Sequence, residues 1–186
     1  MSLIVNNYFG GKIKTINPKV FIDERGFFSE IYNKNQFIDI GILDNFVQDN
    51  YSFSKHRGTI RGLHFQAPPM DQSKLIRVVK GKIFDVVVDL RKNSKFYGKH
   101  LSFELTAKEM RQLYISTGFA HGFCVLEDNT EIVYKTSQFY SKECDKTILW
   151  NDQTISIKWP LSDKNVIVSN KDKNGINFSD FISPFL

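Results

Sequence analysis

The sequence contains little cysteine and no long apolar segment. Both features limit the classes of protein to which the chain can belong. Only two of its 186 residues are cysteine, Cys124 in an apolar run and Cys144 among charged residues. A disulfide framework is therefore not expected, and two plain thiols fit a reducing cytoplasm. The first apolar run, Leu3 to Val5, is too short for a signal peptide, and no run of about 20 apolar residues follows. We therefore expect a cytoplasmic protein without a membrane partner.

A basic stripe is also missing, although Lys and Arg number 25 against 20 Asp and Glu, a formal net charge of +5. Lysines alternate with acids, as in SKECDK, whereas nucleic-acid binding proteins gather cations on one face. We therefore expect no nucleic-acid partner. A modest excess of cations beside 14% aromatic residues suits a nucleotide-diphosphate pocket, because cations bind phosphates and flat rings contact a base.

Repeats, linkers and low-complexity segments are absent, and residues 1–186 are expected to form one domain. Helical signals are few. They predict a short helix at residues 35–42 with an Asn cap, ended by Gly41, and one helical turn at a capping box, Thr106 to Glu109. Short alternating segments instead recur about every eight to twelve residues, which predicts an all-β sandwich or barrel of antiparallel strands.

Candidate chemistry is concentrated in the segment that begins at Arg61. If this segment is a strand, His64 shares its face with Gly62 and Gln66, while the apolar residues between them point the other way. Arg61 is then expected off the face of His64. A polar row, Gln48-x-Asn50-x-Ser52 in an earlier strand, predicts either a solvent face or a polar cavity.

Two further strands follow in the same region. Lys74 begins one of them, and the pair Lys80-Gly81 predicts a hairpin that leads into the next, residues 82–90. Asp85 and Asp89 lie on one face of that last strand among apolar residues. These acids either pair with lysines and arginines or contribute to a site.

Two interpretations of His64 stay open on spacing alone. A lone histidine beside an apolar strand is more often a hydrogen-bonded core residue than a catalyst. However, a histidine, a lysine ten positions later and a glycine that permits close approach, all on neighbouring strands, are typical of an acid/base site.

Taken together, segments along nearly the whole chain resemble the nucleoside-diphosphate 4-keto-6-deoxysugar 3,5-epimerases, typified by dTDP-4-dehydrorhamnose 3,5-epimerase. The matching segments follow the family's order and spacing: FIDERGFFSEIY, FVQDNYS, IRGLHFQ, KLIRVVKGKIFDVVVDLRKNS, RQLYISTGFAHGF, YKTSQFY, ILWND and SNKD. The resemblance implies a cupin-like jelly-roll barrel and an isomerase that needs no cofactor.

The resemblance also implies roles for four residues. His64 would be the catalytic base, Asp172 the carboxylate that orients it, and Tyr134 the acid on the opposite face of the sugar. Lys74 would lie near the carbonyl oxygen. The chemistry requires such groups, because a proton next to a ketone needs a base that titrates near neutral pH, and the enolate oxygen needs a cation or donor.

Further positions resemble the family's substrate contacts. Within one chain these are Gln48, Asn50, Arg61, Lys74, Tyr140 and Asp145, together with His121, for which a structural role between two glycines is the alternative. A second set resembles residues that one subunit lends to its partner's site, which implies a homodimer: Phe21, Arg25 and Glu30. The sequence departs from the family pattern at Tyr51, at Ser73 and at Asp145, where the family usually has His, Gly and Glu.

Several alternatives concern the activity itself. Many jelly-roll proteins bind metals, but His56, His64, His100 and His121 are scattered without a His-x-His motif, so we expect no metal. The nucleotide is dTDP by resemblance, with GDP, including a GDP-linked heptose, as the alternative. Inversion at C3 only, or isomerisation of the keto group, is the alternative activity, and a non-catalytic nucleotide-binding barrel is the third interpretation.

Overall fold

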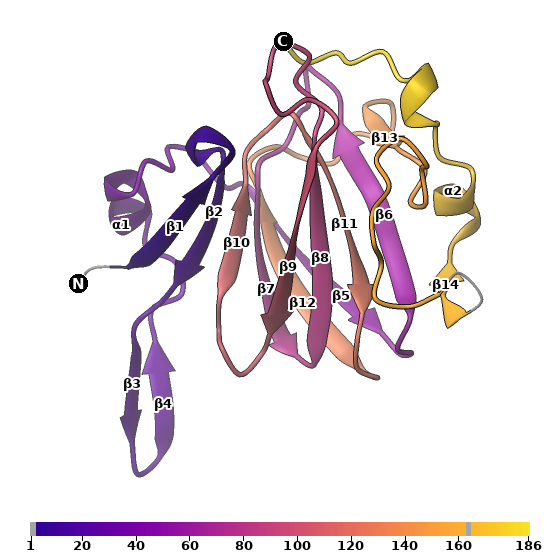
Figure 1. Cartoon of the computed structure of the whole chain (residues 1–186). Helices are drawn as coiled ribbons and strands as arrows, with labels where there is room; N and C mark the ends of the chain where they lie inside the picture. Colours follow the sequence, from indigo (N-terminus) through magenta and orange to yellow (C-terminus); the bar gives the residue numbers. More distant parts are fainter. Residues whose placement is uncertain (1–2, 163–164) are drawn as a thin grey trace.

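The computed structural model describes residues 3–162 and 165–186, and two antiparallel sheets dominate it (Figure 1). The first sheet has the strand order β1 (Ile4–Tyr8), β2 (Ile13–Asn17), β10 (Gln112–Ile115), β7 (Lys74–Lys80), β12 (Thr130–Thr136) and β5 (Gln48–Ser54). The second has the order β13 (Asp145–Thr147), β6 (Thr59–Gln66), β11 (Phe119–Val125), β8 (Lys82–Asp89) and β9 (His100–Thr106), with β14 (Ile167–Val168) parallel to β6.

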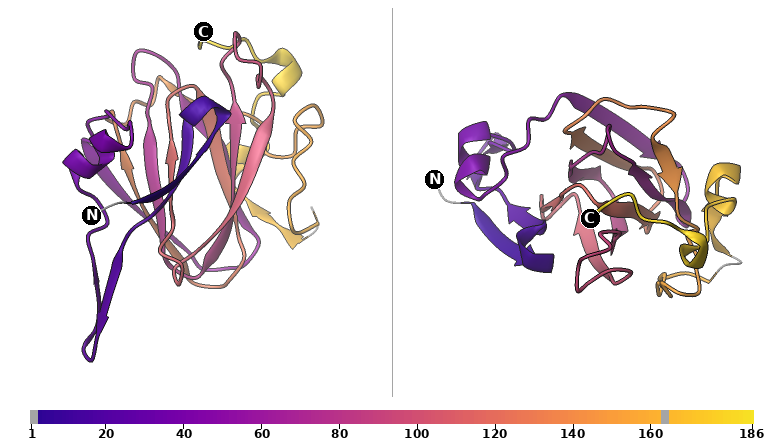
Figure 2. Two further views of the ribbon diagram at one scale, coloured as in Figure 1. Left: turned by 60° about the vertical axis from the view of Figure 1, so that its left-hand side comes forward. Right: turned by 90° about the horizontal axis from the view of Figure 1, so that it is seen from above.

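The two sheets face each other and form a jelly-roll barrel, as Figures 1 and 2 show from three directions. The helical elements are short, and they include α1 (Lys34–Asp39), α2 (Asn170–Lys173) and the 3-10 turns η1 (Phe9–Gly11) and η3 (Phe178–Asp180). The prediction of an all-β fold with little helix is therefore confirmed. Among residues 3–162 and 165–186, no helix is long and apolar enough to cross a membrane.

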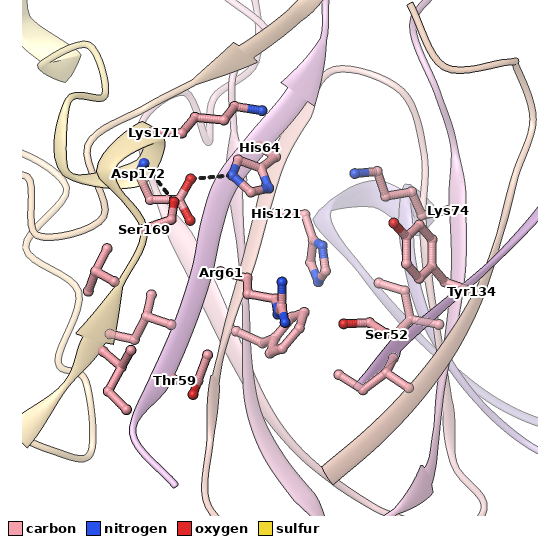
Figure 3. A pocket seen from close by; sticks show the side chains of 16 residues that line it. Ser52, Thr59, Arg61, His64, Lys74, His121, Tyr134, Ser169, Lys171 and Asp172 are labelled. Carbon is pink, nitrogen blue, oxygen red and sulfur yellow. Dashed lines mark hydrogen bonds and ion pairs between the residues drawn. The ribbon is translucent and has the colours of Figure 1, made fainter. Parts of the chain in front are cut away.

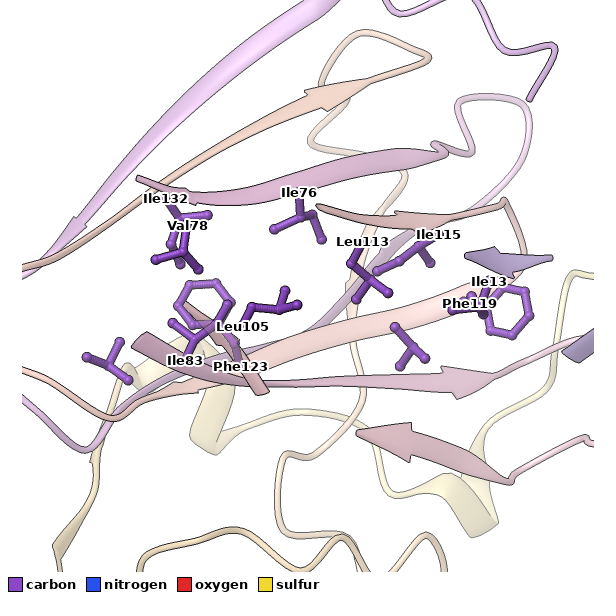
Figure 4. Packing of buried hydrophobic residues seen from close by; sticks show 12 residues of the cluster. Ile13, Ile76, Val78, Ile83, Leu105, Leu113, Ile115, Phe119, Phe123 and Ile132 are labelled. Atoms are coloured by element: carbon purple, nitrogen blue, oxygen red, sulfur yellow. The ribbon is translucent and has the colours of Figure 1, made fainter. Parts of the chain in front are cut away.

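The barrel interior is packed where apolar side chains of the two sheets meet (Figure 4). Strand alternation directs every second side chain inward, so each sheet contributes one face to this core. The first sheet supplies Ile13, Ile76, Val78, Leu113, Ile115 and Ile132, and the second supplies Ile83, Val87, Leu105, Phe119, Phe123 and Val125. This core closes part of the barrel and leaves the remainder for a cavity.

The outer face of the second sheet is covered by the C-terminal part of the chain (Figure 1). Leu63 on β6 and Val86 on β8 pack there against Ile148, Ile155 and Phe185. Strand β8 is consequently buried on both faces, which explains its continuous apolar run.

The predicted hairpin between Lys74 and Leu90 is wrong. Strand β7 pairs with β10 and β12 in the first sheet, whereas β8 pairs with β11 and β9 in the second. Gly81, with φ of 79°, therefore lies at a corner where the chain crosses from one sheet to the other. Both strands were predicted correctly, but alternation contains no information about which neighbour a strand will pair with.

The two helical predictions had different outcomes. Helix α1 is capped by Asn33, whose side chain accepts from Asn35 N at 3.1 Å, so the helix begins earlier than expected and ends before Gly41. At the predicted capping box, Glu109 N donates to Thr106 Oγ1 at 3.2 Å, but the segment remains a turn. The predicted helical turn is therefore wrong: Met110 follows with φ of 53°, and a left-handed residue cannot continue a right-handed helix.

The hairpin of β3 (Val20–Asp23) and β4 (Gly26–Ser29) projects away from the barrel (Figures 1 and 2). The chain turns between Asp23 and Gly26. Several large apolar side chains of this hairpin are exposed, among them Ile22 at 82% and Phe28 at 68%. Because isolated two-stranded hairpins are marginal in water, this element is of interest as a contact surface.

Candidate active site

A cavity of about 510 Å³ lies between the two sheets (Figure 3). Its lining includes His64 and Arg61 from β6, His121 from β11, and Lys74 and Tyr134 from β7 and β12 of the facing sheet. Apolar side chains, among them Ile76, Phe123, Ile132 and Val168, make up much of the remaining lining. Six residues that sequence analysis selected for catalysis or binding are thus brought together from distant parts of the chain: Arg61, His64, Lys74, His121, Tyr134 and Asp172.

His64 and Asp172 form a hydrogen-bonded pair at one side of this cavity. His64 Nε2 lies 2.6 Å from Asp172 Oδ1, and the side chains are 30% and 4% exposed. Burial opposes ionisation of Asp172, but the hydrogen bonds from His64, Gly62 N and Ser169 outweigh it, so the Asp172 pKa lies below its usual value. An ionised carboxylate on Nε2 leaves Nδ1 as the nitrogen that faces the cavity.

Local structure brings Asp172 to His64. Strand β14 runs parallel to β6, and α2 begins directly after it with Ser169 as its cap, whose Oγ accepts from Asp172 N at 3.1 Å. Asp172 Oδ2 also accepts from Gly62 N at 3.2 Å. Gly62 has φ of 131°, and a Cβ atom there would lie 2.5 Å from Gly122 Cα, so glycine is required for this close approach, as expected.

Arg61 lines the same cavity as His64, and the expectation that it lies off that face is wrong. The register between β11 and β6 shifts: His121 is opposite His64 but Phe123 is opposite Arg61. Between these two pairs β6 has two residues, Gly62 and Leu63, where β11 has only Gly122. This β-bulge interrupts alternation and turns Arg61 toward the cavity. Its Nε donates to Ser54 Oγ at 3.2 Å.

Lys74 and Tyr134 lie across the cavity from His64 (Figure 3). Burial lowers the pKa of Lys74 to about 8, although Asp145 and Asp85 act in the opposite direction. Burial also raises the pKa of Tyr134, which the charge of Arg61 partly offsets. At neutral pH the arrangement therefore has a cation and a phenol on the side opposite the histidine.

A second histidine–aspartate pair lies deeper in the barrel. His121 Nε2 is 2.8 Å from Asp85 Oδ2, and both side chains are nearly buried. Asp89, the other acid of β8, pairs with Arg91 at 2.6 Å. The expectation that these acids pair with a cation is thus confirmed for Asp89, while the partner of Asp85 is a histidine on the adjacent strand.

A smaller polar cavity of about 200 Å³ adjoins the first one. Gln48, Asn50, Tyr140 and Asp145 line it, so the polar row on β5 faces a cavity and not solvent alone. Gln48 Nε2 donates to Asn50 Oδ1 at 2.8 Å, and Tyr140 OH donates to Asp145 Oδ2 at 3.2 Å.

Sequence analysis missed Lys171, which lines both cavities. Its Nζ forms an ion pair with Asp145 Oδ2, which joins α2 to β13. The available signal was its position beside Asp172 in the segment SNKD.

The three residues expected to act in a partner's site lie apart from both cavities of this chain. Phe21 and Glu30 line a separate groove at the base of the projecting hairpin, and Arg25 at its turn is paired with Asp23 at 2.6 Å.

Within the ranges 3–162 and 165–186, no three His, Cys, Asp or Glu side chains are grouped closely enough to hold a metal ion. The absence of a metal requirement stays a prediction.

Comparison with known proteins identifies the family. The family model for dTDP-4-dehydrorhamnose 3,5-epimerase matches residues 11–180. The chain belongs to the dTDP-4-dehydrorhamnose 3,5-epimerase family. It is 52% identical over 164 residues to the Shigella flexneri protein of that name, covering 88% of this chain and 89% of the relative.

Solved structures agree with this family assignment. The Bacillus anthracis epimerase, with TDP and PPi bound, has a TM-score of 0.92 and 43% identity, covering 95% of this chain and 100% of that one. The Legionella pneumophila epimerase, in complex with dTDP-4-keto-L-rhamnose, has a TM-score of 0.90 and 38% identity, covering 95% and 93%. The predicted epimerase family, enzyme class and cupin-like jelly-roll fold are confirmed.

The lowered pKa of Lys74 predicts a pH-dependent cost to stability. Between about 8 in the folded chain and its ordinary value of 10.5, the unfolded chain binds more protons at this position, so the destabilising contribution of Lys74 decreases as pH rises across that window. A Lys74→Met variant loses this contribution. Its free energy of unfolding should therefore exceed that of wild type most at neutral pH, and the difference should shrink toward pH 10.5.

Denaturant unfolding at a series of pH values measures this difference. The matched control is Lys55→Met, because Lys55 is exposed and the change should leave the pH dependence unaltered. A difference between Lys74→Met and wild type that stays constant across the window would show that Lys74 does not titrate there.

Proposed function

We propose that this protein catalyses epimerisation at C3 and C5 of a nucleoside-diphosphate 4-keto-6-deoxy sugar of the dTDP-4-dehydrorhamnose type. The observation that carries the proposal is the His64–Asp172 pair, which faces Lys74 and Tyr134 across one cavity in a chain of this family. Relatives with TDP or dTDP-4-keto-L-rhamnose bound support a thymidine nucleotide.

His64 is the proposed base. Asp172 accepts the hydrogen bond of Nε2, which leaves Nδ1 to take a proton from the sugar carbon next to the ketone. The C–H bond breaks, its electron pair forms the enolate and Nδ1 gains the proton. The Asp172 carboxylate then stabilises the imidazolium, the function that such a carboxylate has in catalytic triads.

Lys74 is the proposed partner of the enolate oxygen. Negative charge develops on that oxygen as the proton leaves. A preformed cation in a site shielded from water stabilises the charged enolate more than the neutral ketone. With a pKa of about 8, the Lys74 side chain is mostly cationic at neutral pH. Its position across from His64 fits a sugar ring held between them.

Tyr134 is the proposed donor for inversion. Its raised pKa keeps the phenol protonated, so it can deliver a proton to the enolate carbon from the face opposite His64. One inversion leaves His64 with an extra proton and Tyr134 without one, and exchange with water resets both groups. The same pair serves C3 and C5 in turn, because each carbon is next to the C4 ketone.

Cations and amides that line the two cavities are the proposed contacts of the remaining substrate. Arg61 and Lys171 line the large cavity and suit a diphosphate. The small cavity, with Gln48, Asn50 and Tyr140, suits hydrogen bonds and ring contact with the nucleoside, and His121 is a candidate sugar contact.

We further propose a homodimer in which the hairpin of β3 and β4 completes the partner's site. Phe21, Arg25 and Glu30 lie outside the cavities of their own chain, and the exposed apolar side chains of the hairpin favour burial against a second copy. Location in the cytoplasm, inferred from the two free thiols, also stays a prediction.

Solvent deuterium tests the proposed reaction and its base together. Incubation of dTDP- and GDP-linked 4-keto sugars with wild-type protein in deuterated water should give two incorporated deuterons with the dTDP-linked 6-deoxy hexose. His64→Asn should abolish uptake at both carbons while nucleotide affinity persists, and Asp172→Asn should slow it by orders of magnitude, about 10² or more.

Each other result has a distinct meaning. One deuteron would indicate a C3-only enzyme, preference for a GDP-linked sugar would reassign the nucleotide, and nucleotide binding without any uptake would indicate a non-catalytic barrel. Undiminished uptake by His64→Asn would remove His64 as the base.

Tyr134→Phe should separate proton removal from inversion. The variant keeps the ring and loses only the donor, so the enolate should still form and should collect deuterium from the His64 side with retained configuration. Inversion should slow by about 10² to 10⁴, the usual effect of a lost acid/base group. Deuterium content and product stereochemistry are followed in one reaction, and an unchanged ratio of inversion to exchange would exclude Tyr134 from the mechanism.

Mixed dimers test whether Arg25 acts in the neighbouring site. Wild-type protein should have a scattering mass near twice the 21.6 kDa of one chain. Co-expressed His64→Asn and Arg25→Ala chains should regain activity, because in mixed dimers one site receives both intact residues, about a quarter of all sites. A monomeric active enzyme, or mixed chains no more active than the two variants apart, would contradict the proposal.

A further inference from the structure

The His121–Asp85 pair has no part in the proton transfers proposed above, although it lies within the same barrel. Its geometry resembles that of the His64–Asp172 pair, with Nε2 and a carboxylate oxygen 2.8 Å apart. Asp85 is more deeply buried: its side chain is 0% exposed, and that of His121 is 10% exposed. A carboxylate removed from water to this degree requires compensation from cations or donors.

Strand register explains how this pair reaches the cavity. Strand β11 lies between β6 and β8, with His121 opposite His64 on one side and Phe123 opposite Asp85 on the other. His121 and Asp85 are therefore diagonal neighbours on adjacent strands, both directed into the barrel. Lys74 faces them from β7 of the other sheet and lines the same cavity as His121.

The second oxygen of the Asp85 carboxylate is unsatisfied. Asp85 Oδ1 is buried and has no hydrogen-bond partner among residues 3–162 and 165–186. Burial raises the pKa of Asp85, while the charges of His121 and Lys74 act to lower it. The carboxylate thus depends on two neighbouring cationic or donor groups, and it contacts only one of them directly.

We propose that Asp85 is a positioning residue of the epimerase reaction, whose buried carboxylate holds the His121 ring by a hydrogen bond and stabilises the Lys74 ammonium group by its charge. The proposal rests on the proposed function, since it concerns the same cavity and the same enolate. Asp85 acts through His121 and Lys74 and does not itself contact the sugar.

This arrangement fits the demands of the reaction. Lys74 has to keep its charge inside the barrel and also keep its N–H donors available for the enolate oxygen. A carboxylate that faces the ammonium group without a direct hydrogen bond meets both requirements. By binding Nε2 of His121, the same carboxylate leaves the Nδ1 nitrogen of that ring for the substrate.

Other charged or titratable groups also surround Lys74, and they come from every neighbouring element. They are His64 and Arg61 on β6, His121 on β11, Tyr134 on β12, Asp145 on β13, and Lys171 and Asp172 on α2. Asp145 raises the pKa of Lys74 as Asp85 does, but it also pairs with Lys171. Asp85 has no lysine or arginine ion-pair partner among the described residues.

The test is Asp85→Asn beside the matched control Asp89→Asn. Both acids are fully buried on β8, but Asp89 is held by Arg91 and Ser94 and lines neither cavity. The rate of deuterium exchange into the substrate is measured from about pH 6 to about pH 10, together with kcat, KM and the midpoint of unfolding.

The alkaline limb of the pH profile should move in Asp85→Asn only. Activity that needs protonated Lys74 falls as pH rises through its pKa, and removal of a nearby negative charge lowers that pKa. The limb should therefore shift by about one pH unit to lower pH, with kcat reduced more than KM is raised. Asp89→Asn should lose stability and keep the wild-type limb. An unmoved limb in a folded Asp85→Asn protein would overturn the proposal.

Nuclear magnetic resonance provides a second test that needs no turnover. In wild-type protein, nitrogen-15 spectra should show a proton on Nε2 of His121 across neutral pH. A proton on Nδ1 alone would overturn the proposal. This measurement uses only wild-type protein, so it decides the matter even if Asp85→Asn does not fold. The Lys74 side chain should titrate at lower pH in Asp85→Asn than in wild type. If wild-type protein exchanges no substrate proton, the proposed function fails, while these titrations still decide the role of Asp85.

Discussion

The close approach of β6 to β11 is the constraint on which the site depends. Gly62 has no side chain between these strands, and a Cβ atom there would lie 2.5 Å from Gly122 Cα. The bulge at this point turns Arg61 and His64 toward one cavity and frees Gly62 N to bind Asp172. One backbone irregularity thus directs two side chains inward and receives the carboxylate that orients one of them. A larger residue at this position would disturb pairing, orientation and charge together.

The barrel separates two tasks between its two sheets. The second sheet carries His64, His121 and Asp85, and α2 beside it carries Asp172, so in the proposed reaction this side accepts protons and holds negative charge. The first sheet carries Lys74 and Tyr134, which are the proposed donors. A flat ring between the sheets would meet a base on one face and donors on the other, which is the geometry that inversion requires. A jelly roll provides this arrangement because facing sheets about 10 Å apart hold opposed side chains at a fixed distance.

Sequence analysis reached the strands and the main residues, and it failed where contacts depend on pairing. Alternation predicted β6, β7 and β8, because a period of two is a local property. It could not show that β7 and β8 belong to different sheets, and a regular strand put Arg61 on the wrong face. Resemblance supplied His64 with Asp172, residues 108 positions apart, which no local pattern joins. The roles of these residues remain proposals, although their proximity is observed.

Charge balance within the cavity explains why so many ionisable groups lie close together there. A diphosphate and an enolate are both anionic, so a site for them requires cations, yet buried cations without anions are costly. Asp85 and Asp145 offset the charges of Lys74 and Lys171, while Asp172 and Asp85 are hydrogen-bonded to His64 and His121. The donors therefore stay directed at the cavity. The acids of this barrel are best understood as the groups that allow its cations to remain charged where substrate anions would bind.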